Sequence, residues 1–125
     1  MAQESIAVFT AKSVNHILTV GGSCSWALNP VHARQLPYVV CTRNARHPQV
    51  EGREEHGSAF LVGCVKDVVP SPEYPGRWLI EFSDYAEIYV TRVWKSWRNP
   101  VRYTNFVDLG IDPATLHFQP MPRGH

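Results

Sequence analysis

The sequence predicts a small α+β barrel with two or three short helices, built as a single domain over residues 1–125. The chain has 125 residues, of which 44% are hydrophobic and 18% are charged, a balance typical of one globular unit with one core. It contains 10 prolines and 8 glycines, which favour many short elements over long helices. The apolar segments are short and β-prone, as in a barrel made of several strands.

Four elements are expected in the first third of the chain. Residues 6–9 (IAVF) form a short β-prone segment, and residues 15–20 fit either a short helix or a strand. Asn29 is followed directly by a proline, the pattern of a helix cap and first helical position, so we expect a short helix over residues 31–36. Residues 38–42 (YVVCT) predict a buried strand.

The middle of the chain has the strongest strand signals. Residues 44–57 are polar and rich in turn formers, which favours a mobile surface loop. Residues 58–69 predict a strand, with Gly63 inside it as a bulge or a point of close approach. Residues 70–76 (PSPEYPG) predict a turn, and the alternating segment 77–82 should pair with the preceding strand as a hairpin.

The last third is expected to hold one more strand and a helical turn. Residues 86–90 (AEIYV) predict a further strand. Residues 104–112 fit a short helical turn that Thr104 caps and Gly110 ends. Phe118, near the end of the chain, is expected to dock in the core.

The cysteines and the apolar runs indicate a reduced cytoplasmic protein. Cys24, Cys41 and Cys64 form an odd set without a CxxC pair, so neither a disulfide framework nor a zinc knuckle is expected. We expect no cofactor and no metal site; Cys24, His16 and His32 have no diagnostic ligand spacing. The apolar runs are too short to span a bilayer, and MAQESIAVFT lacks the features of a secretory signal.

The charges are unevenly distributed on a chain of net charge +1. One basic stretch without acids holds Arg92, Lys95, Arg98 and Arg102. A second stretch, opposed by a single glutamate, holds Arg43, Arg46 and Arg53. These stretches predict a basic face on a nearly neutral molecule, while pairing of the arginines with acids at Glu81, Asp84 and Glu87 is the alternative.

The stretch GGSCSWALN, residues 21–29, allows two interpretations. In one, Cys24 at a helix start is a nucleophile, since papain-like proteases carry Gly-Ser-Cys-Trp there. Against this, Ser25 separates the cysteine from Trp26, and Pro30 would break a long nucleophile helix. In the other, residues 25–27 form one wall of a pocket for a flat ring, and Cys24 is a small apolar side chain.

A family resemblance supports the pocket. The run Lys-Ser-Val-Asn-His at 12–16, followed by Ser-Trp-Ala-Leu-Asn at 25–29, resembles the start of YTH domains. Three further segments follow in the order in which YTH domains have them. They are the hydrophobic strand at 38–43, the Phe-Leu-Val-Gly strand at 60–65 and the late Asn-Pro segment at 99–110. YTH domains belong to the PUA-like group with the EVE and ASCH domains, and the chain is similar to PUA-like domains of the EVE/YTH type.

The resemblance implies a PUA-like β-barrel whose pocket holds one extruded, modified base from DNA or RNA, without chemistry. By position, Trp26 matches the first wall of the cage, while Trp78 and Trp97 are candidates for the rest. The expected polar readers are Ser13, Asn15, Ser25 and Asn29. The alternatives are core packing for the tryptophans and helix capping for Asn29.

The implied partner is nucleic acid with a single-stranded or flipped base. Lys95, Arg98 and Arg102 are the candidates for contacts with the phosphate backbone. We expect no membrane partner.

Two other functions remain open from the sequence. An ASCH-type hydrolase acting on an acylated nucleoside would use Lys12 with a hydroxyl and a carboxylate; the available side chains are Thr10 or Ser13 and Glu81 or Glu87. A protein-interaction module would instead present exposed Trp94 and Trp97 to a partner chain.

Overall fold

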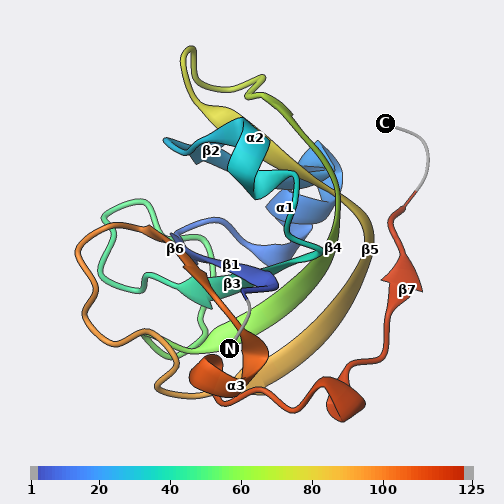
Figure 1. The fold of residues 1–125 in the computed structure, drawn as a ribbon. Coiled ribbons are helices and arrows are strands. Elements are labelled where there is room, and N and C mark those ends of the chain that lie inside the picture. Colours follow the sequence, from blue (N-terminus) through green and yellow to red (C-terminus); the bar gives the residue numbers. More distant parts are fainter. Residues whose placement is uncertain (1–2, 123–125) are drawn as a thin grey trace.

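One mixed sheet, curled into a half-barrel, forms the body of the protein in the computed structural model, which describes residues 3–122 (Figure 1). The strands follow the order β2-β5-β4-β3-β1-β6, and β7 pairs with β5. The long strands are β4 (Ala59–Pro70) and β5 (Trp78–Val90). The others are β1 (Ser5–Thr10), β2 (Gly22–Trp26), β3 (Tyr38–Arg43), β6 (Val101–Thr104) and β7 (Gln119–Pro120).

Short helices fill the connections. They are α1 (Val14–Val20), α2 (Pro30–Ala33), α3 (Phe106–Leu109) and the 3₁₀ turn η1 (Pro113–Thr115). The parallel pairing of β1 with β3 needs a crossover, and α1, β2 and α2 supply it. A barrel-like α+β fold with few short helices is therefore confirmed. None of the helices within residues 3–122 is long and apolar enough to cross a membrane.

The ambiguous segment 15–20 is a helix because both of its ends are capped. The Ser13 hydroxyl accepts a hydrogen bond from the backbone amide of His16 at 3.0 Å. Gly21 ends the helix in the left-handed region, with φ of 97°. The polar N-terminus of α1 is thus held at the end of β1, where the candidate site lies.

The two strands predicted at 77–82 and 86–90 form the single strand β5. Its pairing with β4 is antiparallel over nearly its whole length, with register shifts between Cys64 and Val65 and between Val65 and Asp67. Such irregularities bend a ribbon without ending it. Consequently β4 and β5 curve around the molecule, as Figure 1 shows.

Two expectations for the C-terminal third are wrong. Asn105, not Thr104, caps α3, because its side chain accepts from the Asp108 amide at 2.8 Å while Thr104 is the last residue of β6. Phe118 is 37% exposed and stacks on the Tyr38 ring instead of entering the core. Gly110 ends α3 with φ of 75°, as predicted.

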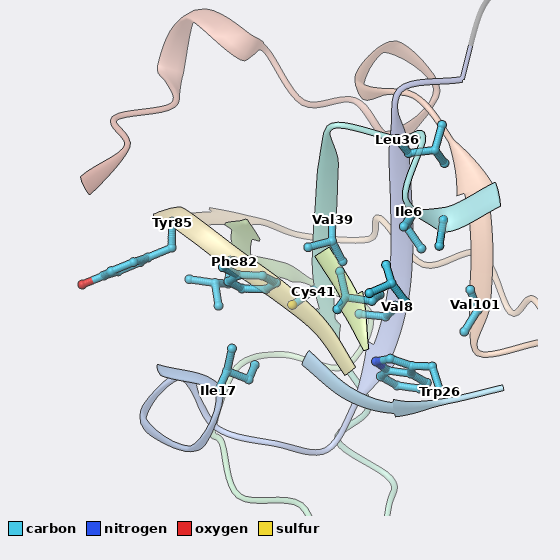
Figure 2. Packing of buried hydrophobic residues seen from close by; sticks show 14 of the residues in the cluster. Ile6, Val8, Ile17, Trp26, Leu36, Val39, Cys41, Phe82, Tyr85 and Val101 are labelled. Carbon is cyan, nitrogen blue, oxygen red and sulfur yellow. The ribbon is translucent and has the colours of Figure 1, made fainter. Parts of the chain in front are cut away.

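The core is divided by the alternation of side chains along the sheet. Ile6 and Val8 of β1 point to one cluster, and Ala7 points to the other. Trp26 belongs to the first cluster, where it packs with Val8 and Val101 (Figure 2). This cluster is the floor on which the candidate site is built.

Gly63 is a point of close approach between β4 and β5. A Cβ atom there would lie 2.6 Å from Cγ and Cδ2 of the Phe82 ring. We expect Gly63→Ala to lower the free energy of unfolding by about 1–3 kcal/mol, as overpacking typically does. Urea denaturation measures this, with the exposed Ser83→Ala of β5 as control. Equal stability of the two variants would contradict the tight packing of this ring.

Candidate functional site

A cavity of about 550 Å³ opens beside Trp26, within the range of about 300–1,000 Å³ of small-molecule pockets. It lies at the end of β1 and β2, between the loop at 44–49 and the turn that joins β4 to β5. Its walls are formed by Phe9, Thr10, Ala11, Lys12, Cys24, Ser25, Trp26, Asn44, His47, Gln49, Glu73, Tyr74 and Pro100. The cavity therefore combines aromatic faces with polar groups of both signs.

Trp26, the predicted pocket wall, lies on the strand β2. It ends β2 opposite Trp78, and the residue is only 8% exposed. Its indole Nε1 donates to the Ser23 hydroxyl at 2.9 Å, so the buried N–H is satisfied. Trp26 is thus a core residue that also lines the cavity.

An aromatic stack leads from the cavity toward the basic segment. Phe9 lines the cavity and stacks face to face on Trp94, with centroids 4.8 Å apart and an interplanar angle of 1°. Trp94 meets the edge of Trp97 at 4.9 Å, and the Arg102 guanidinium lies 4.2 Å from the Trp97 ring centroid. The cavity and the basic residues are therefore connected through packed rings.

Of the other predicted pocket residues, only Ser25 lines this cavity; its hydroxyl is hydrogen-bonded to that of Ser71. Ser13 and Asn15 line an adjacent, shallower hollow of about 400 Å³ that shares Glu73 with the cavity. They lie outside the cavity because they begin α1, beyond the polar wall that Glu73 forms.

Asn29, Trp78 and Trp97 do not line the cavity. Asn29 caps α2, accepting from the amides of the two residues that follow Pro30. Trp78 packs against the core cluster from β5. Trp97 is not on a helix with Trp94, and it lies one ring further from the cavity than Trp94 does.

The predicted basic face is only partly present. Arg98 and Arg102 are exposed, and the Lys95 ammonium donates to the Arg92 carbonyl at 2.7 Å. Within residues 3–122 no ion pair joins residues 92–102 to an acid, so the alternative of pairing with Glu81, Asp84 or Glu87 is wrong.

Arg43, by contrast, is fully buried and takes no part in a basic surface. Its Nε donates to Glu54 at 2.9 Å, and its Nη1 donates to the carbonyls of Thr10 and Lys12 at 3.0 and 2.8 Å. The guanidinium also lies 4.1 Å from the Phe60 ring centroid. Arg43 therefore fixes the backbone where β1 enters the cavity.

Glu73 is one of several cavity residues that the sequence did not predict, with Phe9, Asn44, Gln49 and Tyr74. It comes from the proline-rich turn at 70–76, and its Oε1 accepts from the Cys24 thiol at 3.2 Å while its Oε2 contacts His16 Nε2 at 3.0 Å. The hydrogen bond from Cys24 is the main cause that lowers the pKa of Glu73. Tyr74, beside it, is 60% exposed and forms the outer aromatic wall.

Cys24 does not have the environment of a nucleophile. It lies within β2 and not at a helix start. Burial, and then the neighbouring Glu73 carboxylate, raise the pKa of its thiol, which therefore stays protonated and donates a hydrogen bond. The nucleophile interpretation is not supported by this geometry.

The state of Cys24 can be measured by alkylation and peptide mapping. We expect Glu73→Gln to raise the alkylation rate of Cys24 severalfold at mildly alkaline pH, because removing the adjacent negative charge favours the thiolate. Cys64, half-buried on β4, is the internal control for general loosening. A rate that stays constant at Cys24, or rises equally at both cysteines, would contradict the contact.

Known proteins provide no assignment for this cavity. A scan against protein-family models finds no matching family, and searches of the curated proteins and of the solved structures find no match. The fold and the chemistry of the cavity are therefore the grounds for proposing a function.

Proposed function

We propose that this chain is a PUA-like barrel of the EVE/YTH type that binds a modified nucleobase of DNA or RNA in the Trp26 cavity, without chemistry. The observation that carries the proposal is the cavity itself, walled by aromatic side chains at the end of β1 and β2. The curled mixed sheet, with a capped helix following β1, supports a barrel of this group.

The aromatic walls suit a flat heterocycle. Phe9 and Trp26 are held by the core, and Tyr74 forms the exposed side. Stacking of a base on such a ring contributes about 1–3 kcal/mol. A methyl group on the base adds about 0.8 kcal/mol when it is buried, which favours a methylated base over an unmodified one.

The polar walls can read the edge of a base. Lys12 has no hydrogen-bond or ion-pair partner for its ammonium within residues 3–122 and presents donors, while the Glu73 carboxylate presents an acceptor. Asn44 and Gln49 can do both. We therefore propose these four residues, together with Ser25, as the groups that hydrogen-bond to the edge of the base. They replace Ser13, Asn15 and Asn29, which do not line the cavity.

The basic segment lies at the cavity mouth. Pro100 lines the cavity, and its carbonyl accepts from the Phe9 amide at 2.9 Å, which ties this segment to β1. Arg98 and Arg102 flank that proline in the sequence and are exposed, so they are the proposed contacts for phosphates on either side of a bound base. A base must leave its stack to enter, so single strands are the favoured ligands.

Tyr74 tests the cavity without disturbing the core. Trp26→Ala would remove a core residue and destabilise the fold by about 3–5 kcal/mol, which would obscure any effect on binding. We expect Tyr74→Ala to weaken binding of single-stranded oligonucleotides carrying one methylated base by about 5–100-fold, as loss of one stacking partner does.

The control is Tyr89→Ala, because Tyr89 is 59% exposed, like Tyr74, but does not line the cavity. Fluorescence anisotropy with methylated cytosine and adenine in DNA and RNA measures both variants. Equal losses for the two variants, or none for Tyr74→Ala, would exclude the cavity as the binding site.

The phosphate contacts are tested by salt dependence. We expect Arg98→Ala and Arg102→Ala each to weaken binding of all sequences alike and to reduce the slope of log affinity against log salt by about 0.7, the value for one phosphate on a single strand. Lys66→Ala, an exposed change on β4, should leave the slope unchanged. An unaltered slope in the arginine variants rules out a role for them in phosphate binding.

A hydrolase is the second candidate, because Lys12 and Thr10 share the cavity with Glu73. The carboxylates that the sequence offered do not line it: Glu81 lines a separate hollow, and Glu87 lies on β5 opposite Leu61. Incubation with N-acylated nucleosides, followed by mass spectrometry, separates the candidates, since hydrolysis adds water and releases a carboxylic acid. An interaction module is less supported, because Trp94 is buried against Phe9.

A further inference from the structure

His16 is bound between two carboxylates. Its Nδ1 lies 3.1 Å from both oxygens of Glu51, and its Nε2 lies 3.0 Å from Oε2 of Glu73. The histidine side chain is only 23% exposed. It belongs to α1, whereas its two partners come from segments 35 and 57 residues further along the chain.

This arrangement requires a protonated imidazole. A neutral imidazole has one N–H and one acceptor nitrogen, whereas the imidazolium ion has two N–H donors. Glu51 and Glu73 offer only acceptor oxygens when ionised. With neutral His16, one of the two contacts would therefore place an acceptor against an acceptor. That carboxylate would keep only its other side-chain contact, which is the Ser13 amide for Glu51 and the Cys24 thiol for Glu73.

Both carboxylates belong to segments that wall the cavity. The loop that carries Glu51 contributes Asn44, His47 and Gln49 to the cavity, and the turn that carries Glu73 also contributes Tyr74. Neither segment is held by packing in the core, because most of its side chains are exposed. The walls are joined to the start of α1 by the contacts with His16 and by the hydrogen bond from the Ser13 amide to Glu51.

We propose that His16 is a positioning residue: when protonated, it ties both exposed walls of the Trp26 cavity to α1, so ligand affinity falls as the imidazole loses its second proton. The binding part of this proposal rests on the proposed function, whereas the structural part concerns the free protein. His16 touches no ligand in this scheme and acts through Glu73 and Glu51.

The direction of the pH dependence follows from the three groups. The pKa of Glu51 is lowered, mainly by the hydrogen bond from the Ser13 amide. The pKa of Glu73 is lowered, mainly by the hydrogen bond from the Cys24 thiol. His16 contributes to the lowering of both pKa values. The carboxylates therefore stay ionised well below neutral pH, and their contribution is lost only in acid. Only the imidazolium ion has two N–H donors, so both ties are complete when His16 is protonated, and one of them is lost when a rising pH removes a proton from the ring.

Other titratable groups lie near these contacts. Lys12 and Cys24 face Glu73, and Lys12 also acts on Glu51. α1 carries no titratable side chain besides His16. His47 and His56 belong to the same loop region as Glu51, with His56 accepting from the Ala45 amide, so the experiment must separate their titration from that of His16.

Two variants of His16 make that separation. His16→Gln is neutral at every pH and has donors on a single nitrogen, whereas His16→Arg keeps a positive charge and donors on three nitrogens. His117→Gln is the matched control, because His117 is exposed and lies in the C-terminal segment. Both His47 and His56 remain in all of these proteins.

The first measurement is hydrogen exchange of the free proteins, expressed as protection factors, at about pH 5.5 and 8. We expect segments 44–52 and 71–77 of the wild type and of His117→Gln to lose protection at the higher pH. We expect low protection at both values in His16→Gln and high protection at both in His16→Arg. Equal pH responses of the wild type and His16→Gln would overturn the proposal.

The second measurement is binding of the best methylated oligonucleotide from the panel above at the same pH values. Between the lower and the higher pH, we expect the affinity of the wild type to fall at least about fivefold more than that of His16→Arg. A factor of about five is the lower end of typical couplings between sites. If hydrogen exchange changes as expected but no oligonucleotide binds, the proposed function is rejected. The structural role of His16 in the free protein is then still supported. Binding with a pH profile unaffected by either variant would reject the role of His16 alone.

Discussion

The antiparallel pair of β4 and β5 is the interaction on which the rest of the fold depends. It is the longest pairing in the sheet, and the register shifts along it make it curve. β5 pairs with β2 and β7 beyond β4, while β4 pairs with β3, so this one ribbon joins both sides of the half-barrel. The turn at its tip carries Glu73 and Tyr74 to the end of β1 and β2. The same curvature therefore forms the barrel and places two walls of the cavity.

Much of the fold could be predicted because its signals are local. The apolar runs gave β3 and β4, and Asn29 before proline gave the start of α2. β2 could not be predicted, since Gly-Ser-Cys-Ser-Trp is too polar to read as a strand and is held there by pairing with β5. Glu73 was missed for a related reason: its role arises from contacts with Cys24 and His16, at separations of 49 and 57 residues.

The burial of Arg43 contradicts the expectation, drawn from the pattern of charges, that this residue belongs to a basic surface. Arg43 looked like part of a basic surface, yet it is fully buried beneath the end of β1. One nitrogen of its guanidinium, Nη2, has no hydrogen-bond partner among the described residues, and Gly52 packs against it so closely that a Cβ there would lie 2.6 Å away. A buried charge is costly unless it is paired, so Glu54 and the carbonyls of β1 compensate for most of this cost. The sequence pattern of basic residues therefore overstated the charge available at the surface.

The cavity joins two kinds of wall that differ in what holds them. Trp26 and Phe9 are fixed by packing, one in the core cluster and the other against Trp94, and packed interiors deform little. The opposite walls are exposed segments held by hydrogen bonds and ion pairs, which respond to protonation. A flat ring would therefore meet a constant aromatic floor, whereas the polar groups around its edge would shift with the charge of His16. If the cavity binds a base as proposed, shape selection and regulation would thus fall to different residues of the same site.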